Sequence, residues 1–317
     1  MGEHICFRRN ERLATINPYW RGNPMVKGRF FNRQHRFRPG MGSVLKWRLS
    51  PNPQRKEKRT VKWEPRVNYL RSLDAVTGNS LIWLGHNSFF LQLAGKRIMF
   101  DPVFGSIPFV RRRSQFPANT DIFTGIDYLL ISHDHFHHLD KQSVGCLLKS
   151  NPQMKLFCGL GTGELIKSWF PKIEMVEAGW YQQIMDEGLK ITFLPAQHWS
   201  KRSVRDGGQR LWGAFMIQGD GMSVYYSGDT GYSQHFSEIP ELFGAPDYAL
   251  VGIGAYKPVR QTDFQLLRCT TFCFHRVLMR TQDSQQLSKE LHRLMRRRFA
   301  LWKYCISGVV GLTFIKI

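Results

Sequence analysis

A run of four histidines within six positions is the feature that most constrains this 317-residue chain. The histidines are His133, His135, His137 and His138, and they follow the apolar stretch 127–132. Imidazole is the commonest side-chain ligand for zinc and related metals. A short loop at a strand end holds such ligands on a rigid scaffold and leaves them open to solvent. The alternative is a histidine-rich surface turn that binds nothing, but four imidazoles at this spacing, beside two acids, favour a metal site.

Two later segments each place one possible ligand directly after an apolar, alternating stretch. His198 lies in Leu-Pro-Ala-Gln-His-Trp-Ser, and Asp229 lies in Tyr-Tyr-Ser-Gly-Asp-Thr-Gly. Upstream, His86 lies in Gly-His-Asn-Ser and Asp101 lies in Phe-Asp-Pro. Because these segments end strand-like stretches, we expect His198 and Asp229 to converge on the histidine run at one edge of the fold.

The order of these motifs resembles the metallo-β-lactamase superfamily, and within it the branch of N-acyl-phosphatidylethanolamine phospholipase D and its bacterial relatives. The motifs are Gly-His-Asn-Ser, Phe-Asp-Pro, Ser-His-x-His-x-x-His-Leu-Asp, Gln-His-Trp and Ser-Gly-Asp-Thr. The resemblance runs from about Pro18 to about Pro258. It implies an α/β fold of the αββα type, in which two facing sheets carry helices outside. The expected strands and helices alternate in two halves, which suits that sandwich.

The resemblance also implies one or two bound metal ions, which we expect to be zinc. The first metal would take His133, His135 and His198. Asp229 would bridge both metals and is the residue we assign to catalysis. A negative bridge lowers the repulsion between two dications, so an acid is the sensible residue at that place.

Two departures from the family pattern affect the second metal position. His137 stands where the family has an aspartate, whereas the ligand His138 keeps its place. Imidazole is neutral, so this position loses one anionic ligand. The last histidine ligand of the family has no recognisable match after Pro258, and the one plausible substitute is His275, which follows the strand-like stretch 271–274. We therefore expect the second metal to bind more weakly than the first.

Several residues near these motifs have an expected supporting role. Asp140 would accept a hydrogen bond from a ligand histidine, although a helix N-cap for residues 141–150 is the alternative. His86 would line the pocket without binding metal. We interpret Asp101 as a turn former and Asp134 as facing solvent. No residue is assigned to substrate binding.

The charge of the chain is concentrated at its two ends. The chain has 45 basic and 24 acidic residues, and its net charge is +21. Residues 1–66 carry a net charge of +13 and residues 258–317 carry +8, so residues 67–257 are neutral overall. Basic ends can contact an anionic membrane surface, and solvated extensions are the alternative. The neutral centre argues against a dedicated nucleic-acid partner.

The composition also changes after Pro258, because residues 259–307 contain no Gly and no Pro while the whole chain has 28 and 15. A changed reading frame or an unrelated replacement would produce this profile, and so would a genuine divergent helical tail. We expect the αββα fold to be incomplete there, so that the second sheet, whose last recognisable strand is at 248–253, keeps an exposed edge. The predicted division is an irregular basic arm at 1–75, a metallo-β-lactamase-like domain at 76–258 and a divergent basic tail at 259–317.

The expected activity follows from the resemblance. It implies a metal-dependent hydrolase, most specifically a phosphodiesterase that uses a metal-bound hydroxide on a small-molecule or phospholipid substrate. A lactonase or other carbonyl-ester hydrolase of the same fold is one alternative, and an inactive or damaged homologue that binds one metal or none is another. No two of the six cysteines have a secreted-disulfide spacing, and we find no signal peptide or membrane-spanning run. We therefore expect a cytoplasmic protein, with peripheral membrane contact as an option.

Overall fold

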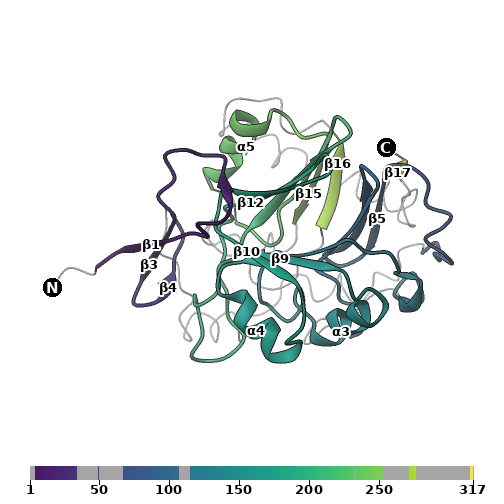
Figure 1. Cartoon of the computed structure of the whole chain (residues 1–317), viewed down its shortest axis with the longest axis horizontal. Helices are drawn as coiled ribbons and strands as arrows, with labels where there is room; N and C mark the ends of the chain where they lie inside the picture. The colour runs from purple at the N-terminus through teal and green to yellow at the C-terminus, as the bar shows by residue number, and fades with distance from the viewer. Residues whose placement is uncertain are drawn as a thin grey trace.

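Two sheets of seven strands pack face to face in the computed structural model, within the residues that it describes (Figure 1). Helices lie on the outer faces of this sandwich, so the predicted αββα architecture is confirmed. No helix among the described residues has the length and apolar character that crossing a membrane requires. The structure describes residues 4–33, 49, 67–106, 115–231 and 233–252, together with the backbone of 271–275 and 315–316.

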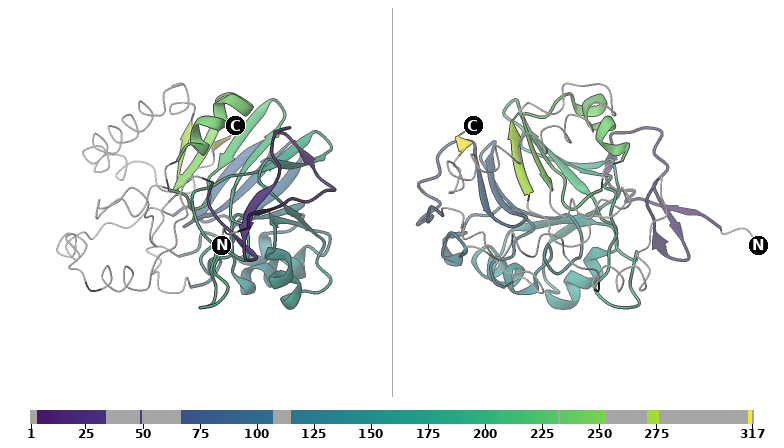
Figure 2. Two further views of the ribbon diagram at one scale, coloured as in Figure 1. Left: turned by 90° about the vertical axis from the view of Figure 1, so that its left-hand side faces the viewer. Right: turned by 180° about the vertical axis from the view of Figure 1, so that it is seen from behind.

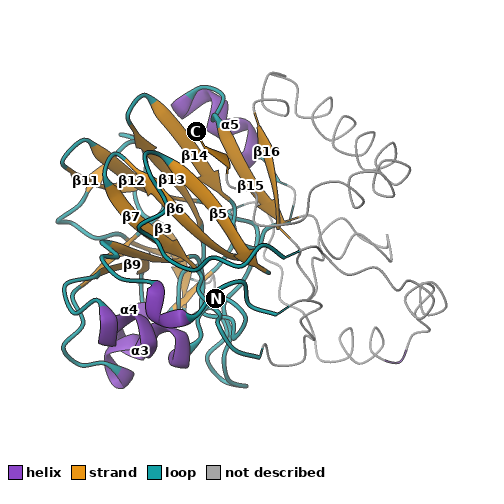
Figure 3. Ribbon diagram, turned by 90° about the vertical axis from the view of Figure 1, so that its right-hand side faces the viewer, coloured by secondary structure: helices purple, strands orange, loops and turns teal. Residues whose placement is uncertain are grey.

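The first sheet forms around parallel central strands that are buried and apolar after the charged residues that begin two of them, as expected for strands covered on both faces. Its outer face packs on α3 (Lys141–Ser150) and α4 (Thr162–Trp169), which lie together on one side in Figure 3. A short 3-10 helix, η1 (Thr120–Ile122), lies in the connection between the central strands at 96–100 and 128–131. In order across the sheet, the strands are β10 (Met175–Ala178), β9 (Lys155–Gly159), β8 (Tyr128–Ile131), β7 (Lys96–Phe100), β6 (Ser88–Leu93), β5 (Ser80–Gly85) and β17 (Ile315–Lys316).

The second sheet is mostly antiparallel, and α5 (His235–Phe243) packs on its outer side. Only β14 and β15 pair in parallel, because α5 provides the crossover between them. In order across the sheet, the strands are β16 (Thr271–His275), β15 (Tyr248–Gly252), β14 (Met222–Tyr226), β13 (Ala214–Gly219), β12 (Leu189–Leu194), β11 (Gln182–Asp186) and β2 (Ala14–Thr15).

One edge of the sandwich brings loops from the two sheets into direct contact. The backbone N–H of Gly213 donates to the carbonyl of Ser132 at 2.9 Å. A Cβ atom on Gly228 would lie 2.7 Å from the Cβ of Ser132, so only glycine fits there, and its φ of +54° is also one that favours glycine. The loops after β8 and β14 therefore meet at van der Waals distance.

The N-terminal arm is more regular than expected where the structure describes it. β1 (Cys6–Arg8), β3 (Asn23–Val26) and β4 (Arg29–Phe30) form a small sheet of their own, and β2 extends the second large sheet. Figure 2 shows these strands at one end of the molecule and β17 at the other. Phe30 is buried and anchors the arm in the core, while Trp47 and Trp63 lie outside the described residues.

Two short strands from the C-terminal segment join the large sheets. β16 pairs with β15 from Tyr248–His275 to Gly252–Thr271, and β17 pairs with β5. The expectation of an exposed edge at β15 is therefore wrong, because β16 occupies that edge through backbone hydrogen bonds. The other residues of 253–317 lie outside the described part, so the helical tail and the frame change stay predictions.

Candidate metal centre

Four buried side chains converge where the loops of the two sheets meet. The structure brings one ligand atom from each of His133, His135, His198 and Asp229 within 4.8 Å of the others. His133 and His135 follow β8, His198 follows β12, and Asp229 follows β14. The Nε2 atoms of His133 and His198 lie 2.8 and 3.2 Å from Nδ1 of His135. Residues far apart in the sequence thus form one cluster, as their positions at strand ends predict.

The electrostatics of this cluster suit a divalent metal. Burial, followed by repulsion from neighbouring histidines, lowers the pKa of His133 and of His135 well below the usual value. Burial also lowers the pKa of His198 to about 3, against the attraction of Asp229. Burial alone would raise the pKa of Asp229, but His138 and other histidines hold it well below its usual range. Three neutral imidazoles and one carboxylate form a donor set that fits zinc and similar ions.

A second histidine cluster adjoins the first across Asp229. Ligand atoms of His86, His137 and His138 also lie within 4.8 Å of one another. Nε2 of His138 is 3.3 Å and Nε2 of His137 is 4.0 Å from Oδ2 of Asp229. The buried Nε2 atom of His137 has no hydrogen-bond partner. Because buried polar atoms are rarely left unpaired, this atom fits a ligand that faces a metal.

Asp101 holds the second cluster in place, which corrects its expected role as a turn former. Its Oδ2 atom accepts hydrogen bonds from His138 Nδ1 at 2.6 Å and from the hydroxyls of Ser132 and Tyr226 at 2.5 Å each. Burial would lower the pKa of His138, but Asp229 and Asp101 raise it to about 9. With its Nδ1 directed at a carboxylate, His138 presents Nε2 to the site, which is how carboxylates orient metal-binding histidines.

Asp140 does not take the expected supporting role. Its carboxylate accepts hydrogen bonds from the backbone N–H of Ser143 at 2.9 Å and from the Ser143 hydroxyl at 2.6 Å. These contacts make Asp140 the N-cap of α3, which was the alternative interpretation. The supporting carboxylate of the site is Asp101, which comes from a neighbouring strand instead.

Asp134 is buried, although we expected it to face solvent. Its carboxylate accepts from the guanidinium of Arg210 at 2.9 Å and from the backbone N–H of Lys201 at 2.9 Å. Burial raises its pKa even though Arg210 opposes the shift. Arg202 donates to the carbonyls of Asp134 and Leu139 at 2.8 and 2.7 Å. The segment that follows His198 is therefore hydrogen-bonded to the histidine loop at several points.

Asn32, in the N-terminal arm, is a functional residue that sequence reasoning missed. Its Nδ2 donates to the carbonyl of His198 at 2.8 Å, and its Oδ1 accepts from the His198 N–H at 3.2 Å. The same Oδ1 accepts from the indole of Trp212 at 3.2 Å. No spacing signal links positions 166 residues apart. The arm thus fixes the backbone of a proposed metal ligand.

The backbone position of His275 does not favour its expected role as the last ligand. Because β16 runs antiparallel to β15, His275 lies opposite Tyr248, at the far end of the strand from Gly252. The loop of Asp229 follows β14 at the Gly252 end, so roughly 13 Å of strand separates the two at about 3.3 Å per residue. The side chain of His275 and the basic loop 111–113 lie outside the described residues.

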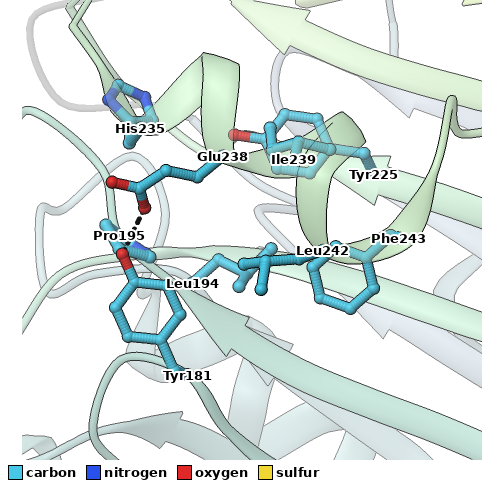
Figure 4. Close-up of a pocket in the computed structure, with 9 residues that line it drawn as sticks. All are labelled: Tyr181, Leu194, Pro195, Tyr225, His235, Glu238, Ile239, Leu242 and Phe243. Atoms are coloured by element: carbon cyan, nitrogen blue, oxygen red, sulfur yellow. Dashed lines mark hydrogen bonds between the residues drawn. The ribbon is translucent and has the colours of Figure 1, made fainter. Parts of the chain in front are cut away.

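A separate hollow lies between α5 and the second sheet (Figure 4). Apolar side chains line most of it, and the Tyr181 hydroxyl donates to the Glu238 carboxylate across it. Burial lowers the pKa of its one histidine, His235, to about 3. His235 and Glu238 are the only residues of this lining that could bind a metal, which is too few for a site. The histidine clusters are therefore the candidate site.

Two facing sheets with a histidine and aspartate cluster at their shared edge define a metal-dependent hydrolase of the metallo-β-lactamase fold. The family model described as the beta-lactamase superfamily domain matches residues 96–296, which is more than half of the chain. The chain belongs to this family. The matched range extends beyond Pro258, where the readable motifs end.

Several characterised and uncharacterised proteins are similar to the chain. N-acyl-phosphatidylethanolamine-hydrolyzing phospholipase D 1 of Caenorhabditis elegans is 29% identical over 260 residues, which are 74% of this chain and 73% of that protein. A UPF0173 metal-dependent hydrolase of Sulfurisphaera tokodaii is 30% identical over 55% of this chain and 71% of its own length. The chain spans about half, 48%, of the mycobacterial relatives that it matches. Igni18, a metallo hydrolase from Ignicoccus hospitalis, aligns with a TM-score of 0.44 at 22% identity, covering 55% of this chain and 70% of Igni18.

Proposed function

We propose that this metal-dependent hydrolase cleaves a phosphodiester and that zinc is its metal. The C. elegans relative is named as a phospholipase D that hydrolyses N-acyl-phosphatidylethanolamine, and a phospholipid of that class contains a phosphodiester. The similarity to that relative over 74% of the chain is the observation that carries the proposal. Phospholipids or small phosphodiesters would be the substrates. The net charge of +13 on residues 1–66 supports peripheral contact with an anionic membrane surface.

The described residues have three roles, which are to bind metal, to orient a ligand and to fix the ligand loops. His133, His135 and His198 would hold one metal, and Asp229 would contribute its ionised carboxylate to that site. Asp101 orients His138 by accepting a hydrogen bond from its Nδ1. A bound divalent metal would supply a Lewis acid and lower the pKa of water at the site. Asn32 and Arg202 hold the two ligand loops by their backbone carbonyls, which keeps the donors at fixed separations.

A substrate panel with metal analysis tests this proposal. The panel contains N-acyl-phosphatidylethanolamine in mixed micelles, bis(4-nitrophenyl) phosphate and an aliphatic lactone. We expect hydrolysis of the two phosphodiesters, its loss after chelation and its return with Zn²⁺. Asp229→Asn should abolish turnover, whereas Val204→Ala, at an exposed position, should not change it. Turnover of the lactone alone would favour a carbonyl-ester hydrolase, and metal-loaded protein without any turnover would favour an inactive homologue.

A further inference from the structure

The second metal position lacks two ligands of the family pattern. His137 replaces its carboxylate, and the register of β16 places His275 at the wrong end of β15. His138 and the shared carboxylate of Asp229 remain, separated by 3.3 Å. A metal held by so few protein ligands would bind weakly, because zinc sites in proteins use three or four.

His86 also lies close to the second metal position, within 4.8 Å of ligand atoms of His137 and His138. It lies in the turn between β5 and β6, and its φ of +53° is uncommon for a residue other than glycine. The Trp83 indole donates to the His86 carbonyl at 2.8 Å, which fixes the turn. Nε2 of His86 lies 3.2 Å from Nδ1 of His137. The strained turn thus aims an imidazole at the second cluster.

His137 supplies an independent sign that this cluster takes a ligand. The residue is only 6% exposed, and its Nε2 has no hydrogen-bond partner. Leaving a buried polar atom unpaired is unfavourable, because the atom loses its hydrogen bonds to water without replacement. That atom points toward the carboxylate of Asp229 at 4.0 Å, a separation too long for a hydrogen bond and compatible with an ion between the two groups.

We propose that His86, His137 and His138 form a three-imidazole set for a second divalent metal, with Asp229 shared between this set and the first. His86 and His137 replace the missing carboxylate and the missing C-terminal histidine. The set contains a single carboxylate, so it selects borderline transition metals such as Zn²⁺ and Co²⁺ over Mg²⁺ and Ca²⁺, which prefer oxygen ligands. This inference rests on the metal-dependent hydrolase fold and not on phosphodiester cleavage.

Metal binding to the metal-free full chain tests the proposal without substrate. Zn²⁺ and Co²⁺ titrations, with stoichiometry read by native mass spectrometry, should give two equivalents, and the second should bind more weakly. His86→Ala should leave one equivalent or weaken the second step by at least ~100-fold, beyond the 10–100-fold typical of an orienting residue. His4→Gln, at an exposed histidine, is the matched control and should bind as the unmodified chain does.

His86→Gln separates a ligand from an orienting residue. Glutamine can accept a hydrogen bond from Nδ1 of His137, but it is a poor zinc ligand. If His86 binds metal, His86→Gln resembles His86→Ala in both stoichiometry and the Co²⁺ absorption spectrum. Retention of the second equivalent in His86→Gln, or a single equivalent in the unmodified chain, overturns the proposal. Thermal unfolding of each metal-free variant shows that the fold is intact, and a failed phosphodiester panel leaves this result unaffected.

Discussion

Nδ1 of His138 lies 2.6 Å from Oδ2 of Asp101, and this buried pair joins the histidine loop to the end of β7. The backbone N–H of Ser132 donates to the other oxygen of the same carboxylate at 2.8 Å. Tyr226 reaches it from the second sheet. One carboxylate therefore ties together both sheets and the loop that carries most of the proposed ligands, which makes its removal informative.

Asp101→Asn should weaken the second metal more than the first. The amide keeps the size of the carboxylate but cannot accept from all four donors that converge on it, so His138 loses its fixed orientation. We expect the second metal affinity to fall ~10–100-fold and the free energy of unfolding to fall by about 1–3 kcal/mol. Metal titration and urea unfolding measure both. Asp121→Asn, at an exposed position, is the control, and an equal loss at both metal positions would argue against this role.

Asn32→Ala should weaken the first metal position. The substitution removes two hydrogen bonds to the backbone of His198 and leaves buried groups unpaired, which costs about 1–3 kcal/mol of stability. His198 would then sample other positions, so the affinity for the first metal should drop. Co²⁺ titration measures that affinity. Asn17→Ala, at a half-buried position whose side chain accepts from the backbone N–H of Tyr19 within the arm, should leave it unchanged. The idea fails if the Asn32 variant is destabilised but binds the first metal normally.

His137→Asp should increase the metal content of the second position. The substitution restores the carboxylate of the family pattern and adds a negative charge beside the ion. We expect a tighter second step in a Zn²⁺ titration, with the first step unchanged. Two equally tight equivalents in the unmodified protein would contradict the premise that this position is the weaker one.

Gly228→Ala should destabilise the contact between the loops that follow β8 and β14. The new methyl group would lie 2.7 Å from the Cβ of Ser132, and the residue would keep a left-handed φ. Gly221→Ala is a matched control, because its φ is +70° but nothing lies within 4 Å of the added methyl. We expect the Gly221 variant to show the backbone cost alone, about 1 kcal/mol, and the Gly228 variant to lose about 1–3 kcal/mol more. Equal melting temperatures for the two variants would exclude a clash.

The stability of the metal-free protein should fall in mild acid, partly through His235. Burial and then the charge of Arg33 lower the pKa of His235 to about 3, and the Arg33–Glu238 ion pair lies beside it. The unfolded chain binds a proton at about pH 6.5, so the stabilisation is complete above that pH and is lost as the pH falls toward 3. Between pH 7 and 5.5 this histidine should account for about 1 kcal/mol. Urea unfolding of His235→Gln should show a correspondingly flatter pH dependence; an unchanged slope would assign the effect to other groups.

The parts of the fold that were predictable have local signals. Residues 141–150 and 162–169 have helical spacing and form α3 and α4, and residues 88–100 alternate around Gly95 and form the β6–β7 hairpin. β10 and β11 were not predicted because they are short and half-buried, without a clear alternation of apolar and polar residues. In the arm, β2 was not predicted because its partner β11 lies far away in the sequence. β1, β3 and β4 were not predicted because they are only two to four residues long.

The site shows the same limit. His133, His135, His198 and Asp229 were accessible because each follows a strand. Asp101 has the histidine-orienting role that we expected of Asp140, and Asp140 caps α3 instead. Each acid lies next to a strand or helix end, and its partner depends on packing. Asp134 was misplaced because its partner Arg210 is 76 positions away. Pairing of buried charges between distant segments leaves no periodic trace in the sequence.

The contact between Asn32 and His198 has a practical consequence for dissecting this protein. A fragment of residues 76–258 contains every ligand described above and would pass for a minimal catalytic unit. Without the arm, however, the backbone amide and carbonyl of His198 lose their partner, and Trp212 loses one as well. The metal content of a preparation would then depend on whether the N-terminal arm packs against His198. The choice of N-terminal boundary and of an N-terminal tag will therefore influence the measured metal occupancy, as substitutions at the ligands do.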